Sequence, residues 1–215
     1  ANTGLRIVIA ALAAVLTAAC IAWSLDAPSR LGVAFFTQQL LALVLGLGLG
    51  IIFFSVSLRG KPHEAGFPWF DVLLGAIALG VCGWICIEYE RLLNDVPYYT
   101  PEIIWLSVVL IPLVLEGLRR CTGWALMIVV LVFIVYALVA EYAPIVIRGR
   151  PASFSQVVSY LALDTNGLFG SPLKVGAEVV ILFLFMGDIL IRGGGGEFFI
   201  DLAKSLLGRK RGGPA

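Results

Sequence analysis

Long apolar stretches alternate with short polar ones along almost the whole chain. A helix of about 20 residues, rising about 1.5 Å per residue, crosses the roughly 30 Å hydrocarbon core of a bilayer. Six stretches are long enough once their flanks are counted, at about Leu5–Leu25, Phe35–Leu58, Pro68–Glu90, Pro101–Arg120, Gly123–Tyr142 and Val175–Ile191. The pattern therefore predicts an all-α integral membrane protein with about six transmembrane helices.

Two shorter segments have a different pattern, in which apolar and polar residues share the turns of a helix. Residues Ser153–Leu163 form the first, and Phe198–Leu207 form the second. This amphipathic spacing is typical of helices that lie in the membrane interface. The glycines of 193–196 precede the second segment and are expected to end the last crossing, because glycine weakens a helix.

Composition supports a membrane protein. Hydrophobic residues make up 60% of the chain, charged residues only 13%, and the mean hydropathy is +1.00. A soluble domain carries about 25% charged residues.

The distribution of Lys and Arg predicts the orientation, since cytoplasmic loops are enriched in both. With six crossings, ten fall on the side of the two ends (Arg6, Arg59, Lys61, Arg119, Arg120, Arg192, Lys204, Arg209, Lys210, Arg211) and five on the other (Arg30, Arg91, Arg148, Arg150, Lys174). Both ends are therefore predicted to be cytoplasmic.

Signals of an enzyme are missing from the sequence. The lone His63 lies in a basic loop, and the glycine run sits at a helix end, where it is expected to break the helix and not to cradle a phosphate. No catalytic residue, cofactor site or metal site is therefore predicted. Cys82 and Cys86 share a helix face, which leaves a membrane thiol redox enzyme as the last-ranked alternative. The basic Arg209–Arg211 end is interpreted as a positive-inside anchor, with no nucleic acid partner.

Three ionisable residues of the last crossing are candidate intramembrane sites. Lys174 and Glu178 are four residues apart, and so are Asp188 and Arg192. A charge at the bilayer centre costs roughly 2.5–3.5 kcal/mol on insertion scales. Either each acid pairs with its basic neighbour and reaches towards the interface, or Glu178 and Asp188 face another helix or a substrate path. The sequence leaves both interpretations open.

A further charged group lies at the end of the fourth crossing. Glu116 precedes Arg119 and Arg120 by three and four residues, which predicts a local ion pair at the membrane edge.

Several segments resemble the fused membrane subunits of tripartite ATP-independent periplasmic (TRAP) transporters, in the form that pairs with TAXI-type binding proteins. The junction LEGLRR followed by GW at 123–124 is similar to the family's LEATRR-x-x-G-W. Four later segments are also similar, namely GLFGSPL at 167–173, LFMG at 184–187, FFIDLA at 198–203 and GRKRGGPA at 208–215. The resemblance covers about Val114–Ala215, and Glu178 and Asp188 stand where the family has small or neutral residues.

The resemblance implies a division of the chain. Residues 1–120 would correspond to the small membrane subunit, a scaffold of helices, and residues 121–215 to the start of the large transporting subunit, here truncated. It also implies sodium-coupled uptake of organic anions, such as carboxylates, across the bacterial inner membrane. The implied partners are a periplasmic substrate-binding protein, the remainder of the large subunit and the lipid bilayer. The family's sodium and substrate residues would follow GGPA, so none is assigned in this chain.

The chain is accordingly expected to be the N-terminal membrane portion of a TRAP-type permease, without enzymatic activity. The alternative is a self-contained scaffold or assembly subunit with no transport activity of its own.

Overall fold

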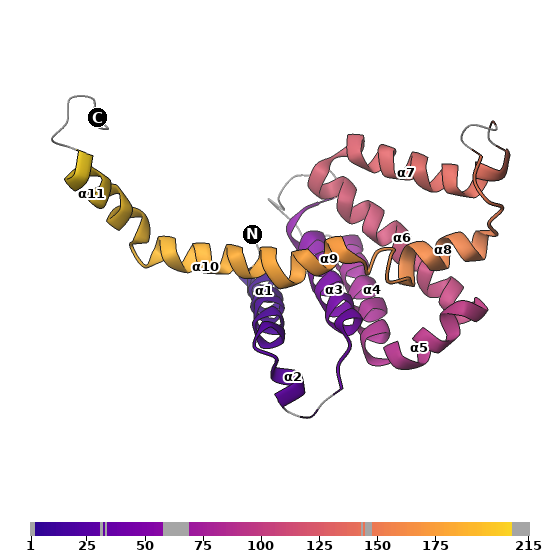
Figure 1. The fold of residues 1–215 in the computed structure, drawn as a ribbon, viewed down its shortest axis with the longest axis horizontal. Coiled ribbons are helices and arrows are strands. Elements are labelled where there is room, and N and C mark those ends of the chain that lie inside the picture. The colour runs from indigo at the N-terminus through magenta and orange to yellow at the C-terminus, as the bar shows by residue number, and fades with distance from the viewer. Residues whose placement is uncertain are drawn as a thin grey trace.

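The computed structural model describes residues 3–30, 32, 34–57, 69–142, 144 and 148–207, and every regular element within these ranges is a helix (Figure 1). In chain order they are α1 (Thr3–Ser24), α2 (Ala27–Arg30), α3 (Thr37–Ser55), α4 (Trp69–Ile87), α5 (Tyr89–Asp95), η1 (Val96–Tyr98), α6 (Pro101–Thr122), α7 (Trp124–Val139), η2 (Ala140–Tyr142), α8 (Phe154–Leu163), α9 (Ser171–Val175), η4 (Gly176–Val180), α10 (Ile181–Arg192) and α11 (Gly195–Leu207). The elements η1 and η2 are 3₁₀ turns, and η4 is a π-helical turn.

The predicted fold class is confirmed. Among the described residues, five helices are long and apolar enough to cross a membrane, namely α1, α3, α4, α6 and α7 with its 3₁₀ extension η2. The sixth predicted crossing is an unbroken helical run of α9, η4 and α10, in which the π turn interrupts the α-helical hydrogen bonding. The first predicted amphipathic segment forms α8, where Ser153 accepts a hydrogen bond from the backbone of Gln156 as an N-cap.

Two predicted boundaries are wrong in an informative way. The third crossing was expected to reach Glu90, but α4 ends at Ile87 and a separate α5 follows. Of the four glycines, only Gly193 and Gly194 form the break between α10 and α11. Gly194 takes a φ of +81°, a left-handed conformation that glycine adopts without steric cost. The remaining two glycines, Gly195 and Gly196, form the first turn of α11.

The helix α3 lies at the centre of the bundle and contacts α1, α4, α6 and α9. Its closest approach is to α4, where a Cβ added at Gly46 would lie 2.6 Å from the Cβ of Cys82. Of the three glycines of α3, Gly46, Gly48 and Gly50, it is Gly46 that lets the two backbones approach this closely. A Cβ added at Gly48 would meet nothing within 4 Å. The separation of α3 and α4 is therefore set by a small residue on the face of α3 that contacts α4, and not by every glycine of α3.

The later helices have fewer neighbours. Figure 1 shows α10 and α11 extending away from the bundle, while α9 and the π turn cross α3 and α1. None of the α10 side chains is buried. Two features noted in the sequence, the loop with His63 and the basic Arg209–Arg211 end, lie outside the described residues.

Candidate functional site

Four charged side chains gather where α3, α4, α6 and α7 meet, and we call Asp71, Glu116, Arg119 and Arg120 the junction cluster. Arg120 donates from Nη2 to Asp71 Oδ1 and from Nε to Glu116 Oε1, each at 2.7 Å. Its Nη1 donates to the carbonyl oxygen of Val56 at the end of α3, at 2.8 Å. The side chains of Arg120 and Asp71 are only 0% and 2% exposed. Arg120 therefore joins three helices within one buried hydrogen-bonded group.

Arg119 occupies the outer part of the cluster. Its guanidinium forms a bidentate ion pair with Glu116, which we call the Arg119 fork. In it Nε donates to Oε2 at 2.8 Å and Nη2 donates to Oε1 at 2.7 Å. The Arg119 Cζ also lies 5.2 Å from the centroid of the Trp124 ring, and the Arg120 Cζ lies 4.9 Å from that of Phe53. Both arginines are thus stacked on aromatic faces as well as paired, which suits the planar guanidinium better than an ammonium group.

The local sequence explains most of this geometry. Helical spacing brings side chains at i+3 and i+4 back over residue i, so both arginines reach Glu116 from within α6. The helix then ends at Gly123, whose φ of +84° turns the chain directly into α7 and places Trp124 beside Arg119. The cluster carries two carboxylates and two guanidinium groups, and each carboxylate accepts a hydrogen bond from Arg120. Removing one partner of such a buried pair is strongly destabilising, so the cluster helps to hold the three helices together.

Asp71 is the member that our sequence reasoning missed. It lies in the first turn of α4, 49 residues before Arg120. A signal was available, because Asp71 is the acidic residue of the otherwise apolar stretch 69–87, and an ionisable residue in a membrane helix is a functional candidate by default. The partner could not be read from the pattern, since no local spacing connects the two helices.

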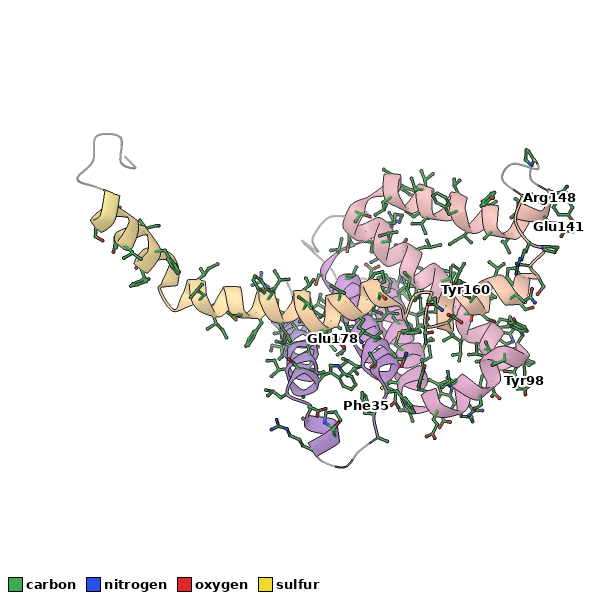
Figure 2. The ribbon with its side chains drawn as sticks, in the orientation of Figure 1. Phe35, Tyr98, Glu141, Arg148, Tyr160 and Glu178 are labelled. Atoms are coloured by element: carbon green, nitrogen blue, oxygen red, sulfur yellow. The ribbon has the colours of Figure 1, made fainter. Side chains whose placement is uncertain are left out.

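The residue Glu178 lies in the π turn and contacts another helix. Trp23 of α1 donates from its indole Nε1 to Glu178 Oε1 at 3.0 Å, whereas Lys174 Nζ approaches the same oxygen only to 4.0 Å. The Trp23 ring also lies 6.1 Å from that of Phe35, and Figure 2 shows Glu178 and Phe35 in the same part of the molecule. The structure thus combines the two interpretations of Glu178, with a cross-helix hydrogen bond and a long contact to its local neighbour.

Replacing Trp23 by Phe removes this cross-helix donor. We expect the free energy of unfolding to fall by about 0.5–1.5 kcal/mol, the usual contribution of one such hydrogen bond. Unfolding of the purified protein by SDS in mixed micelles, followed by circular dichroism, measures the change. Trp105→Phe, at a tryptophan of α6 that is 67% exposed, is the matched control. Equal effects of the two substitutions would show that the Trp23–Glu178 contact contributes nothing.

Asp188 has a purely local environment in the structure. Its Oδ2 accepts from Arg192 Nε at 2.7 Å, and the side chains of Arg192 and Asp188 are 79% and 58% exposed. Exposed pairs of this kind contribute little to stability.

A second ion-pair group lies at the other end of α4 and α6. Arg91 of α5 donates to Glu102 at 2.7 and 3.1 Å and to Glu88 at 3.0 Å, and Trp84 donates to Glu102 at 3.0 Å. The hydrogen bonds to Glu102 and then to Glu88 raise the pKa of Arg91, so its charge persists at any physiological pH. This group is much more exposed than the junction cluster and joins the short α5 to the start of α6.

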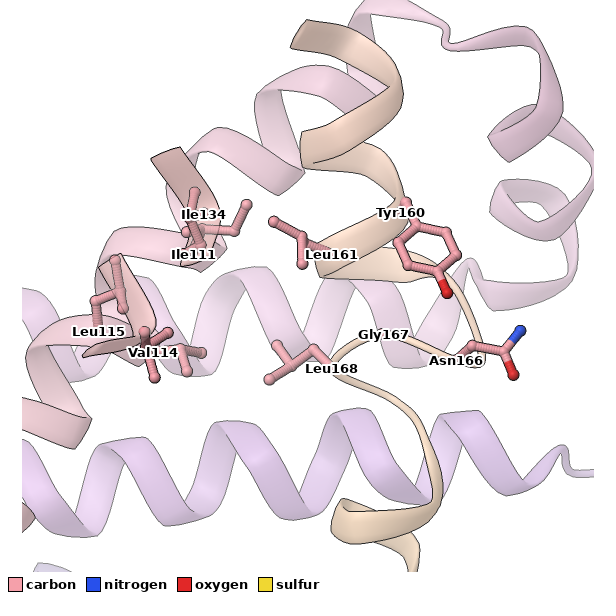
Figure 3. A pocket seen from close by; sticks show the side chains of 10 residues that line it. Ile111, Val114, Leu115, Ile134, Tyr160, Leu161, Asn166, Gly167 and Leu168 are labelled. Atoms are coloured by element: carbon pink, nitrogen blue, oxygen red, sulfur yellow. The ribbon is translucent and has the colours of Figure 1, made fainter. Parts of the chain in front are cut away.

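An apolar cavity of about 350 Å³ lies between α6, α7, α8 and the loop after α8 (Figure 3). Ile111, Ile134 and Leu168 form part of its wall, and Tyr160 and Asn166 supply polar groups at the loop side. No cationic side chain is among its lining residues. The cavity therefore offers no counter-charge to an organic anion.

Cys82 and Cys86, the thiols of the redox alternative, both lie where α4 packs against α3. Cys82 is 1% exposed and packs against Gly46, while Cys86 is partly exposed and its carbonyl accepts a hydrogen bond from Gln39 at 2.8 Å. Both thiols are free in the structure.

Comparison with known proteins gives one finding. The family model of the tripartite ATP-independent periplasmic transporter, DctM component, matches residues 109–215. The match begins within α6, includes the junction cluster residues of that helix and continues through α11. Neither the search of curated proteins nor that of solved structures found a match.

Proposed function

The chain belongs, through residues 109–215, to the DctM component family of tripartite ATP-independent periplasmic transporters, and from this premise we propose that it is the membrane scaffold and entry portion of a sodium-coupled permease for organic anions. The family match is the observation that carries the proposal. Substrate class and coupling ion are inferred from the resemblance of GLFGSPL, FFIDLA and GRKRGGPA to family motifs. No residue of the described ranges is assigned as a sodium or substrate ligand.

The proposed division of labour places a small-subunit-like scaffold at 1–120 and the beginning of the large-subunit-like part at 121–215. The junction cluster supports a rigid connection between them. It joins Val56 and Asp71 of the first part to the α6–α7 turn, so that α7 starts from a fixed position. Supporting contacts of this kind keep an element in a fixed position.

The proposed setting is the bacterial inner membrane, with both chain ends in the cytoplasm. The excess of Lys and Arg on the side of the ends supports this orientation. A periplasmic binding protein would deliver the substrate to the opposite side, where α5 and α8 lie in the proposed topology.

The experiment that tests the proposed function is uptake into proteoliposomes. The natural permease containing these residues is reconstituted together with its periplasmic binding protein, and uptake of radiolabelled carboxylates is followed with and without an inward sodium gradient. We expect uptake only when both the gradient and the binding protein are present. Uptake that continues after the gradient is collapsed would contradict sodium coupling. Uptake that persists without the binding protein would contradict the proposed partner.

A further inference from the structure

A groove of about 540 Å³ runs between α4 and α6 and is separate from the cavity of Figure 3. Its floor includes Leu113, which is 5% exposed, while Phe70 and Ile77 stand at its sides with 41% and 37% exposure. Because α4 and α6 both qualify as membrane-crossing helices, this groove faces the acyl-chain region of a bilayer.

The lining argues against a docked helix. Helices that pack against each other in membranes use small residues to bring their backbones close together. The groove is lined by Phe, Leu, Ile, Val, Pro and Glu side chains, with no Gly, Ala or Ser among them. In the same bundle, the α3–α4 contact does use a small residue, Gly46. The groove therefore suits a narrow, flexible apolar chain better than a helix.

One end of the groove is charged. Glu116 lines it, with a side chain that is 23% exposed, and the Arg119 fork on Glu116 lies at the same place with 13% exposure. The exposed Trp69 ring, next to Phe70, marks this end as the level of the membrane interface. A carboxylate beside a guanidinium group complements an ammonium beside a phosphate. A purely anionic headgroup would bring its phosphate against Glu116 without an ammonium to compensate.

We propose that the α4–α6 groove binds a zwitterionic phospholipid of the phosphatidylethanolamine type. One acyl chain lies along Leu113, Ile77 and Val108, and the headgroup rests on Glu116 and Arg119. The site stands independently of the proposed transport function, since it requires only that the protein resides in a bilayer.

The first test uses native mass spectrometry. The full chain is reconstituted in bilayers with equal amounts of phosphatidylethanolamine and phosphatidylglycerol, extracted in mild detergent and weighed with its bound lipid. The wild type is expected to retain phosphatidylethanolamine preferentially. Ile77→Trp fills the groove and is expected to lower the ratio of lipid-bound to lipid-free protein at least about tenfold, which corresponds to about 1.4 kcal/mol. Ile128→Trp, at a 50% exposed position of α7, is the matched control and should keep the lipid.

The second test needs no variant, so it decides the matter even if Ile77→Trp fails to fold. Phosphatidylethanolamine with a photoreactive acyl chain is cross-linked to the wild type in bilayers, and the labelled residues are mapped. We expect labelling to concentrate on residues 70–77 and 108–116. Uniform labelling of all lipid-exposed helices, equal retention of phosphatidylglycerol, unchanged lipid binding in Ile77→Trp, or a second protein chain cross-linked at the groove would each overturn the proposal.

Discussion

Replacing Arg120 by Met is expected to destabilise the folded chain by about 3–5 kcal/mol, the cost of breaking a buried ion pair by removing one partner. The substitution keeps much of the apolar stem but removes the hydrogen bonds to Asp71, Glu116 and the Val56 carbonyl. The Asp71 carboxylate then stays buried without the guanidinium that it contacts. Unfolding by SDS in mixed micelles measures the loss.

A double substitution separates charge from shape. Asp71→Leu combined with Arg120→Met replaces the buried pair with apolar groups, while Glu116 keeps its fork from Arg119. Since such replacements are often neutral, the double variant should recover most of the lost stability. Arg192→Met, at the exposed pair with Asp188, is the control and should leave stability unchanged. If the double variant is no more stable than Arg120→Met alone, the pairing is not what holds the junction.

The second large effect is expected at the closest contact between α3 and α4. Gly46→Ala adds a Cβ that would lie 2.6 Å from the Cys82 Cβ, so the helices must move apart. We expect a loss of about 1–3 kcal/mol, as for other overpacked sites. The same unfolding measurement in mixed micelles applies.

Gly48→Ala is a closely matched control, because it lies half a turn away on the same helix and its added Cβ meets nothing within 4 Å. Alanine favours a helix over glycine by up to about 1 kcal/mol, so this variant should be neutral or slightly stabilised. Adding Cys82→Gly to Gly46→Ala removes the facing Cβ and should offset the loss, with a coupling of about 1 kcal/mol or more. If Gly46→Ala and Gly48→Ala change the stability equally, the close approach of Gly46 to Cys82 is not the cause of the loss.

The crossings could be predicted from sequence because a bilayer imposes a length and an apolar character on each helix separately. Contacts within one helix were equally accessible, which is why Glu116 could be matched with its two arginines. Asp71 and Trp23 were not, since their partners lie 49 and 155 residues away and their pairing depends on how the helices pack. The π turn was also missed. Its Ile181 N–H bonds the Gly176 carbonyl, five residues back, and nothing in the local apolar pattern distinguishes that bond from an ordinary α-helical one.

The distance in sequence between Asp71 and Arg120 sets an order of events during biosynthesis. At about 5–20 residues per second, the 49 residues between them take roughly 2–10 s to synthesise. For that interval Asp71 has been synthesised while the guanidinium that neutralises it does not yet exist. An acidic residue in a membrane helix resists insertion, so α4 should settle fully in the bilayer only after α6 arrives. The two helices would then enter as a pair, and nascent chains long enough to expose α4 outside the ribosome, but not Arg120, should leave α4 more accessible to water than chains long enough to expose both.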